Sequence, residues 1–259
     1  MSIEELDSLI KKWLYEIKEY LAANKDKVLE VEQKTADNDL VTEMDKFIEE
    51  RLVSNIREHF PEDKIVGEEG FGDEISSLEG RVWIIDPIDG TLNFVKQQEN
   101  FAVMLALYDD GIGQLAYVFD VTDNKLYSAI KNKGVSCNGK QLKKPQDLTL
   151  SEGLIASSSA LMIKNNTSGL KAIAESSLGV RMLGSAGLET LEVVKGNVVA
   201  YLASNLKPWD IAPGIVFMKE LGLTATDFNG NSLDLLSNNN LLLSTNKAHG
   251  EIVDLLKEI

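Results

Sequence analysis

Hydrophobic positions in the first sixty residues recur every three or four residues, which is the period of an amphipathic helix. The first such stretch follows Ser2-x-x-Glu5, which resembles a capping box, and predicts a helix that runs to about residue 23. The second predicts a helix over residues 42–60, with Thr42 as its cap and Pro61 as its stop. The chain is therefore expected to open with two helices, each with one apolar face.

The pattern changes to alternating apolar residues between Phe101 and Leu142, where turn signals such as Asn138-Gly139 separate the runs and predict an antiparallel meander. After residue 150, short apolar runs alternate with helical periods. They predict strands at 153–157, 180–183, 198–203 and 241–244, helices at 168–178, 186–195 and 210–221, and a terminal helix. We expect one mixed α+β or α/β unit over 1–259, with halves 1–145 and 146–259.

The segment from Trp83 to Phe94, WIIDPIDGTLNF, places two acids where an apolar run ends. Its first three residues predict a buried strand, and Asp86 and Asp89 are expected on the loop that follows. Two acids in an apolar setting need a cation to neutralise them, and a divalent metal would do so. Gly90-Thr91 follows at the expected start of a short helix, where free backbone N–H groups suit a phosphate. This segment predicts a metal and phosphate site.

Two further acidic clusters have the same context. Glu68-Glu69 lies between two glycines, directly after the expected strand at 64–66. Asp210 follows Pro208-Trp209 at an expected helix start, in which Pro213 fits the first turn. Taken alone, the first cluster is more typical of a solvated loop and the second of a helix cap.

Composition limits the classes of function. Hydrophobic residues make up 44% and charged residues 26%, as in an ordinary globular protein, but the net charge is −15. This charge disfavours binding to nucleic acid or to an anionic membrane, so we expect neither as a partner. The only cysteine, Cys137, excludes an internal disulfide, and no apolar run approaches the 18 residues of a membrane span. We expect a cytoplasmic protein.

Four motifs together resemble the inositol monophosphatase family of metal-dependent sugar phosphatases. They are KTADNDLVTEMD (34–45), VGEEG (66–70), WIIDPIDGTLNF (83–94) and PWDIAPG (208–214). The resemblance covers nearly the whole chain. It implies a layered α-β-α-β-α sandwich and a phosphomonoester hydrolase that uses two or three Mg²⁺ ions, and the oxygen ligands agree with that metal.

The resemblance also implies roles for individual residues. It assigns the first Mg²⁺ to Glu68, Asp86 and the carbonyl of Ile88, the second to Asp86, Asp89 and Asp210, and a weaker third to the region of Glu68 and Asp39. Thr91, hydrogen-bonded to Asp45, would orient or deprotonate the attacking water together with Glu68. Phosphate or substrate contacts are implied for Lys34, Glu69, Gly90, Thr91, Gly184, Ser185, Ala186, Ala203 and Lys207.

Two departures leave the substrate open. Ala203 stands where the family's animal inositol phosphatases have a Glu that contacts an inositol hydroxyl, and Lys207 stands where they have His. We expect a small phosphorylated metabolite: inositol monophosphate or a related polyol or sugar phosphate. The alternatives are the 2′-phosphate of NADP(H), fructose 1,6-bisphosphate, or 3′-phosphoadenosine 5′-phosphate. A different class, an interaction protein with a vestigial metal site, is the third interpretation. The resemblance further implies a lithium-sensitive homodimer.

Overall fold

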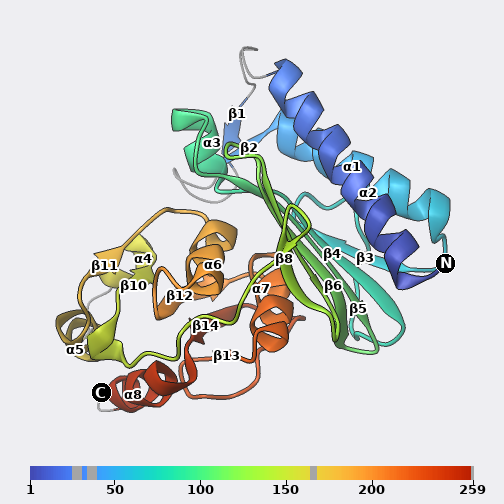
Figure 1. Cartoon of the computed structure of the whole chain (residues 1–259). Helices are drawn as coiled ribbons and strands as arrows, with labels where there is room; N and C mark the ends of the chain where they lie inside the picture. Colours follow the sequence, from blue (N-terminus) through green and yellow to red (C-terminus); the bar gives the residue numbers. More distant parts are fainter. Residues whose placement is uncertain (25–30, 34–39, 164–167, 258–259) are drawn as a thin grey trace.

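The computed structural model describes residues 1–24, 31–33, 40–163 and 168–257, and its two main sheets are separated by helices (Figure 1). The larger sheet has seven strands in sequence order, and only its first pair is parallel. These strands are β3 (Lys64–Gly67), β4 (Arg81–Asp89), β5 (Ala102–Asp109), β6 (Ile112–Asp120), β7 (Lys125–Ile130), β8 (Gly134–Cys137) and β9 (Lys140–Gln141).

The smaller sheet has five strands in the order β11-β10-β12-β14-β13. They are β10 (Ile155–Ser157), β11 (Val180–Arg181), β12 (Ala200–Leu206), β13 (Thr224–Thr226) and β14 (Asn239–Ser244). A separate antiparallel pair, β1 (Val31–Gln33) and β2 (Leu40–Thr42), precedes both sheets.

Helices cover both sheets on both faces (Figure 1). One apolar cluster joins α1 and α2 to the large sheet, a second joins α6 and α7 to both sheets, and a third joins α4, α5 and α8 to the outer face of the small sheet. The layered α-β-α-β-α arrangement is thereby confirmed. The helices are α1 (Ile3–Asn24), α2 (Glu43–His59), α3 (Thr91–Gln97), α4 (Ser159–Ile163), α5 (Ser168–Ser176), α6 (Ala186–Lys195), α7 (Pro208–Glu220), α8 (Asn246–Lys257) and a 3-10 turn at Leu150–Glu152.

Strand β4 shows how the sequence builds this sandwich. Successive side chains of a strand point to opposite faces, and both faces of this sheet are covered by helices. Accordingly, Val82 and Ile84 lie in the cluster with α6 and α7, whereas Trp83 and Ile85 lie in the cluster with α1 and α2. A strand covered on both faces requires a continuous run of apolar residues rather than an alternation of apolar and polar ones.

The expected elements are largely confirmed, and two boundaries differ. Strand β4 continues through Asp89, with a break in its pairing to β5 between Asp86 and Asp89, so the two acids lie on the strand end rather than on a loop. Helix α7 begins at Pro208, because proline fits the first helical position. Pro213 therefore lies inside the helix rather than in its first turn. The short helix α4 was not anticipated.

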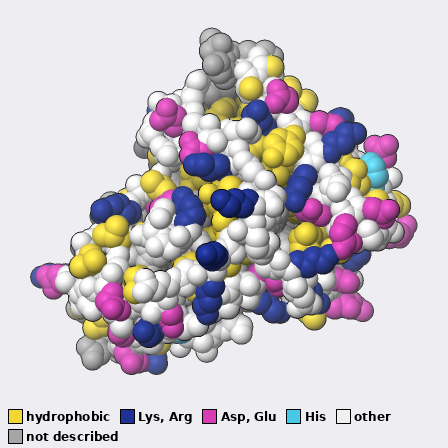
Figure 2. Space-filling model, viewed as in Figure 1, with side chains coloured by type: hydrophobic (Ala, Val, Ile, Leu, Met, Phe, Trp, Pro, Cys, Tyr) yellow, Lys and Arg dark blue, Asp and Glu magenta, His cyan; other side chains and the backbone are white. Residues whose placement is uncertain are grey.

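The surface charge is uneven. Figure 2 shows Lys and Arg side chains gathered across the middle of one face, although the whole chain has a net charge of −15. Within the described part of the chain, no helix combines the length and apolar character needed to cross a membrane.

Candidate active site

Three carboxylates from different parts of the chain meet where β4 ends. Asp86 and Asp89 come from β4 and Asp210 from the first turn of α7, and one oxygen from each lies within 4.8 Å of the others. Asp86 and Asp89 are buried, and Asp210 is half-buried. The break in β4 allows both aspartates of the strand to face the same point, which a regular strand would not allow for residues three apart.

Asp86 has the most unfavourable surroundings of the three. Its Oδ1 is buried and has no hydrogen-bond partner. Burial raises the pKa of this carboxyl well above its usual range, and the charges of Glu68, Asp89 and Asp210 raise it further. A buried carboxylate with a free oxygen and acidic neighbours is destabilising unless a cation binds there.

Asp89 is held by the start of α6. One oxygen accepts hydrogen bonds from the hydroxyl of Ser185 and from the backbone N–H of Gly187 (2.8 Å), and the other accepts from the N–H of Ala186 (2.9 Å). Burial raises the pKa of Asp89 to about 6, although these three bonds oppose the shift. A Cβ on Gly187 would lie 2.3 Å from the sulfur of Met104 and 3.0 Å from Asp89, so only glycine fits this approach.

Asp210 is oriented by its own helix. One carboxylate oxygen accepts the backbone N–H of Lys207 at 2.7 Å, which is the capping contact that its sequence position predicts. Burial and the charge of Asp89 raise the pKa of Asp210 to about 8. The residue therefore caps α7 and contributes to the acidic cluster at the same time.

The predicted pair of Thr91 and Asp45 lies beside this cluster. The Thr91 hydroxyl is 3.1 Å from Oδ1 of Asp45 and 2.9 Å from the carbonyl oxygen of Ile88, and it can donate to either. The other oxygen of Asp45 accepts from the backbone N–H and the hydroxyl of Thr42. Burial raises the pKa of Asp45 to about 6, and the nearby charge of Glu68 adds to this shift.

Glu68 is half-buried on the turn after β3. Its charge raises the pKa of four aspartates, Asp45, Asp86, Asp89 and Asp210, which places it close to the whole cluster. The neighbouring Glu69 donates its backbone N–H to Glu49 of α2. The predicted VGEEG segment thus lies beside both the acids of β4 and the Thr91–Asp45 pair.

A cavity of about 500 Å³ opens next to Asp89 and Asp210. The predicted Gly184, Ser185 and Ala186 form part of its wall. Sequence reasoning missed several polar side chains that also line it, among them Ser157, Glu189 and Tyr201. The signals were present, since Ser157 opens a run of three serines at a strand end and Glu189 follows Ser185 by one helical turn.

Two of these missed residues have unsatisfied polar atoms. The Ser157 hydroxyl and Oε2 of Glu189 are buried and have no hydrogen-bond partner. The other oxygen of Glu189 accepts the N–H of Leu183, and burial raises the pKa of Glu189 to about 7. Buried polar groups are normally paired, so these two atoms in the cavity wall are candidates for contacts with a ligand.

Other predicted site residues lie elsewhere. Ala203 is fully buried in the apolar cluster between the sheets and does not line the cavity, so the structure does not place it at the substrate as the resemblance implied. Lys207 is exposed and lines a separate hollow of about 230 Å³ beside Trp209. Lys34 and Asp39 lie outside the described residues.

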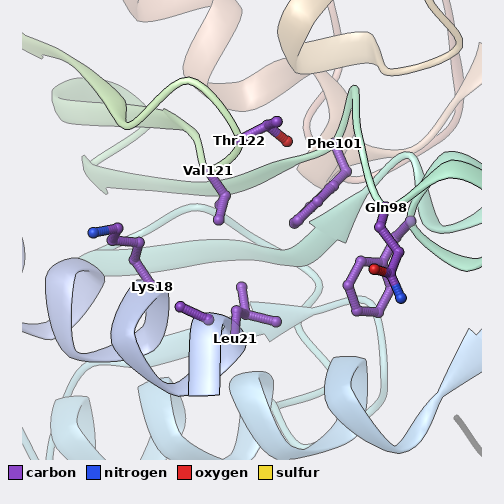
Figure 3. Close-up of a pocket in the computed structure, with 8 residues that line it drawn as sticks. Lys18, Leu21, Gln98, Phe101, Val121 and Thr122 are labelled. Carbon is purple, nitrogen blue, oxygen red and sulfur yellow. The ribbon is translucent and has the colours of Figure 1, made fainter. Parts of the chain in front are cut away.

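A second cavity, of about 160 Å³, has different chemistry (Figure 3). Lys18 and Leu21 of α1 face Phe101 and Val121 across it, and Gln98 and Thr122 stand at its edge. Its lining is mainly apolar and contains no carboxylate. The larger cavity, which borders the acidic cluster, is therefore the candidate substrate site.

Comparison with known proteins agrees with this site. The sequence model of the inositol monophosphatase family matches residues 3–259. The chain is 37% identical over 253 residues to the inositol-1-monophosphatase of Bacillus subtilis, with 96% of each chain covered. It is 32% identical over 257 residues to the fructose-1,6-bisphosphatase/inositol-1-monophosphatase of Thermotoga maritima, which covers 99% of this chain and 97% of that protein.

A solved structure has nearly the same fold. The crystal structure of an IMPase/NADP phosphatase complexed with NADP and Ca²⁺ superposes with a TM-score of 0.93 at 32% identity, covering 98% of this chain and 96% of that one.

Proposed function

The chain belongs to the inositol monophosphatase family and is a phosphatase, and we propose that it is an Mg²⁺-dependent hydrolase of small polyol phosphates such as inositol monophosphate. One observation carries the proposal. Three carboxylate oxygens converge within 4.8 Å beside the larger cavity, and Oδ1 of Asp86, one of these three residues, is buried and unpaired. Phosphate ester chemistry in so acidic a place requires a cation.

The residues fit a divalent metal with oxygen ligands. Asp86, Asp89 and Asp210 would hold one Mg²⁺, and Asp86, Glu68 and the carbonyl of Ile88 a second. Carboxylates whose pKa values are raised by burial and by one another are the donor set that such an ion stabilises. When bound, Mg²⁺ supplies positive charge to the phosphate ester and lowers the pKa of water.

Thr91 and Asp45 orient the attacking water. If the carbonyl of Ile88 is engaged by the metal, the Thr91 hydroxyl donates to Asp45, and its lone pairs face the site as acceptors for a water proton. Asp45 is itself fixed at Thr42, so the Thr91 oxygen has one defined position. Backbone N–H groups at Gly90 and Thr91 are proposed to bind the phosphate oxygens.

The cavity favours a neutral, hydroxylated alcohol group. Among the described residues, its lining includes Asp89, Glu189 and Asp210 and no Lys, Arg or His, so a second phosphate placed there would meet like charge. The free oxygen of Glu189 can accept a substrate hydroxyl, and the Ser157 hydroxyl can donate to one. These two residues supply the polar contacts that Ala203 cannot.

This assignment is tested with two matched pairs of variants. Glu189→Gln and Ser157→Ala alter unpaired polar groups in the cavity wall, whereas Thr190→Val and Ser244→Ala alter unpaired, buried hydroxyls outside it. We expect the first pair to lower kcat/KM for inositol 1-phosphate about tenfold, the cost of roughly one hydrogen bond, and the second pair to leave it within twofold. Equal effects in the two pairs would contradict the assignment.

A second candidate is the 2′-phosphate of NADP(H). The hollow beside Lys207 and Trp209 adjoins the turn that carries Asp210, and it offers a cation and an indole ring to a larger substrate. The superposed NADP phosphatase structure also favours this candidate. Comparing kcat/KM for NADP⁺, fructose 1,6-bisphosphate and inositol 1-phosphate in the unmodified protein and in Lys207→Ala decides it, because only a substrate that reaches Lys207 loses turnover.

The interaction-protein interpretation predicts no phosphate release from any of these substrates with Mg²⁺ present. A homodimer, a cytoplasmic location and inhibition by Li⁺ stay predictions.

A further inference from the structure

Glu49 of α2 is a fully buried carboxylate that reaches the turn carrying Glu68. One of its oxygens accepts the backbone N–H of Glu69 at 2.7 Å, and the other accepts the N–H of Phe71 at 3.0 Å. The two hydrogen bonds span the turn from Glu68 to Gly70. These two bonds hold the backbone that directly follows Glu68.

The turn is shaped to receive this carboxylate. A Cβ added at Gly67 would lie 2.4 Å from Oε1 of Glu49 and 2.8 Å from Oε2. Gly67 does not have the left-handed backbone that usually explains a glycine, so close approach is the reason for it here. The acid on the helix and the glycine on the strand end form a fitted pair.

Helix α2 also sets the opposite side of the active site. Asp45 precedes Glu49 by four residues, so the two carboxylates lie on the same face of the helix, one turn apart. Asp45 contacts Thr91, and Glu49 holds the turn of Glu68. The side chains of Ile48 and Leu52 are fully buried against the large sheet, which holds the helix in place.

We propose that Glu49 is a positioning residue, which through the Glu69 and Phe71 amides sets Glu68 at the distance from the Thr91–Asp45 pair that metal binding needs. The proposal rests on the proposed function, because it assigns Glu68 to a metal. Glu49 acts through these two backbone N–H groups. Its effect is to remove the freedom of the Glu68 turn before the metal binds.

The test compares Glu49→Gln with Ile48→Val, a neighbouring change that costs packing but leaves the turn untouched. The Gln amide keeps the shape and one acceptor but turns an N–H₂ group toward one of the two backbone N–H groups. Hydrogen exchange of the Glu69 and Phe71 amides, measured without Mg²⁺, reports on the turn itself. Calorimetric titration with Mg²⁺ reports on the metal site.

We expect faster exchange at both amides and Mg²⁺ binding weakened about tenfold or more in Glu49→Gln, the range for outer partners of metal ligands. At low Mg²⁺ the weaker metal binding should lower the kcat of Glu49→Gln, and saturating Mg²⁺ should restore part of it. The KM of this variant for inositol 1-phosphate should stay within twofold of the value for the unmodified protein. Ile48→Val should lower the melting temperature and change none of these. In Gly67→Ala, the added Cβ would displace the Glu49 carboxylate from the turn. This variant should therefore show the same faster amide exchange and weaker Mg²⁺ binding as Glu49→Gln.

The role of Glu49 would be overturned if the unmodified protein binds Mg²⁺ and Glu49→Gln shows the same amide exchange and the same Mg²⁺ affinity. Absence of Mg²⁺ binding in the unmodified protein would instead contradict the proposed function. The two failures are therefore distinguishable.

Discussion

The two sides of the acidic cluster differ in how their polar atoms are satisfied. On the α2 side, Asp45 and Glu49 use their carboxylate oxygens in hydrogen bonds within the protein. On the cavity side, Ser157 and Glu189 each keep a buried polar atom without a partner. The carboxylates of the first side are paired within the protein, whereas the second side keeps polar atoms that are available for a ligand.

This difference separates chemistry from selection. A group that must orient water needs a single position, which requires that its own partners be fixed. A wall that selects an alcohol keeps donors and acceptors free for the hydroxyls of its substrate. Changes on the α2 side should therefore lower kcat, and changes on the cavity side should alter the ranking of substrates.

The largest effect is expected for Asp86→Asn, at the point where the two sides meet. Loss of this charge removes a ligand proposed for both metals, so kcat should fall about a thousandfold or more. The control is Asp120→Asn, another acid of the large sheet whose pKa burial raises but which lies outside the cluster. A kcat for Asp86→Asn close to that of the control would break the proposed metal assignment.

Thr91→Ala tests the α2 side, with a smaller expected effect. The alanine methyl group cannot donate to Asp45, which Thr42 holds in place, and it cannot orient water, so kcat should fall roughly a hundredfold while KM changes little. Thr91→Ser keeps the hydroxyl and should recover most of the rate. A change in KM alone would show that Thr91 binds the substrate and does not orient the attacking water.

The cluster as a whole should make stability depend on pH. The pKa values of Asp45 and Asp89 (about 6) and of Asp210 (about 8) are higher in the folded protein than the ordinary value of 3.8. The metal-free folded state therefore binds these protons more tightly than the unfolded chain, and its stability falls as pH rises from about 4 to about 8. Mg²⁺ binds the ionised form, so it should raise the melting temperature more at pH 8 than at pH 5.5.

Differential scanning calorimetry at the two pH values, with and without Mg²⁺, measures this difference. An increase of about 5 °C at pH 8 corresponds to metal well above its dissociation constant. An equal or larger increase at pH 5.5 would show that the raised pKa values do not belong to the metal site. The same scans on Asp86→Asn should show a much smaller response to Mg²⁺.

The sequence predicted the α2 side and the acids of β4 better than the cavity side. Asp86, Asp89 and Asp210 stand in short local motifs, and the capping pattern of Thr42 and Asp45 is local as well. Ser157 and Glu189 come from different elements, β10 and α6, and become neighbours of one cavity only through the packing of the small sheet. No local pattern contains that information.

Ala203 illustrates the same limit. Its place in the chain relative to Asp210 predicted a position at the substrate, but β12 turns this residue into the core, where its methyl group packs between the sheets. Glu49 was also missed, because its partners are two backbone N–H groups 20 and 22 residues away. Backbone partners leave no pattern in the sequence.

The central claim is that the converging carboxylates bind Mg²⁺ for phosphate ester hydrolysis. Phosphate release from inositol 1-phosphate, followed in the unmodified protein from excess chelator to saturating Mg²⁺, tests it most directly. The claim predicts no turnover in chelator and full recovery when Mg²⁺ is restored. Undiminished turnover in excess chelator would contradict it.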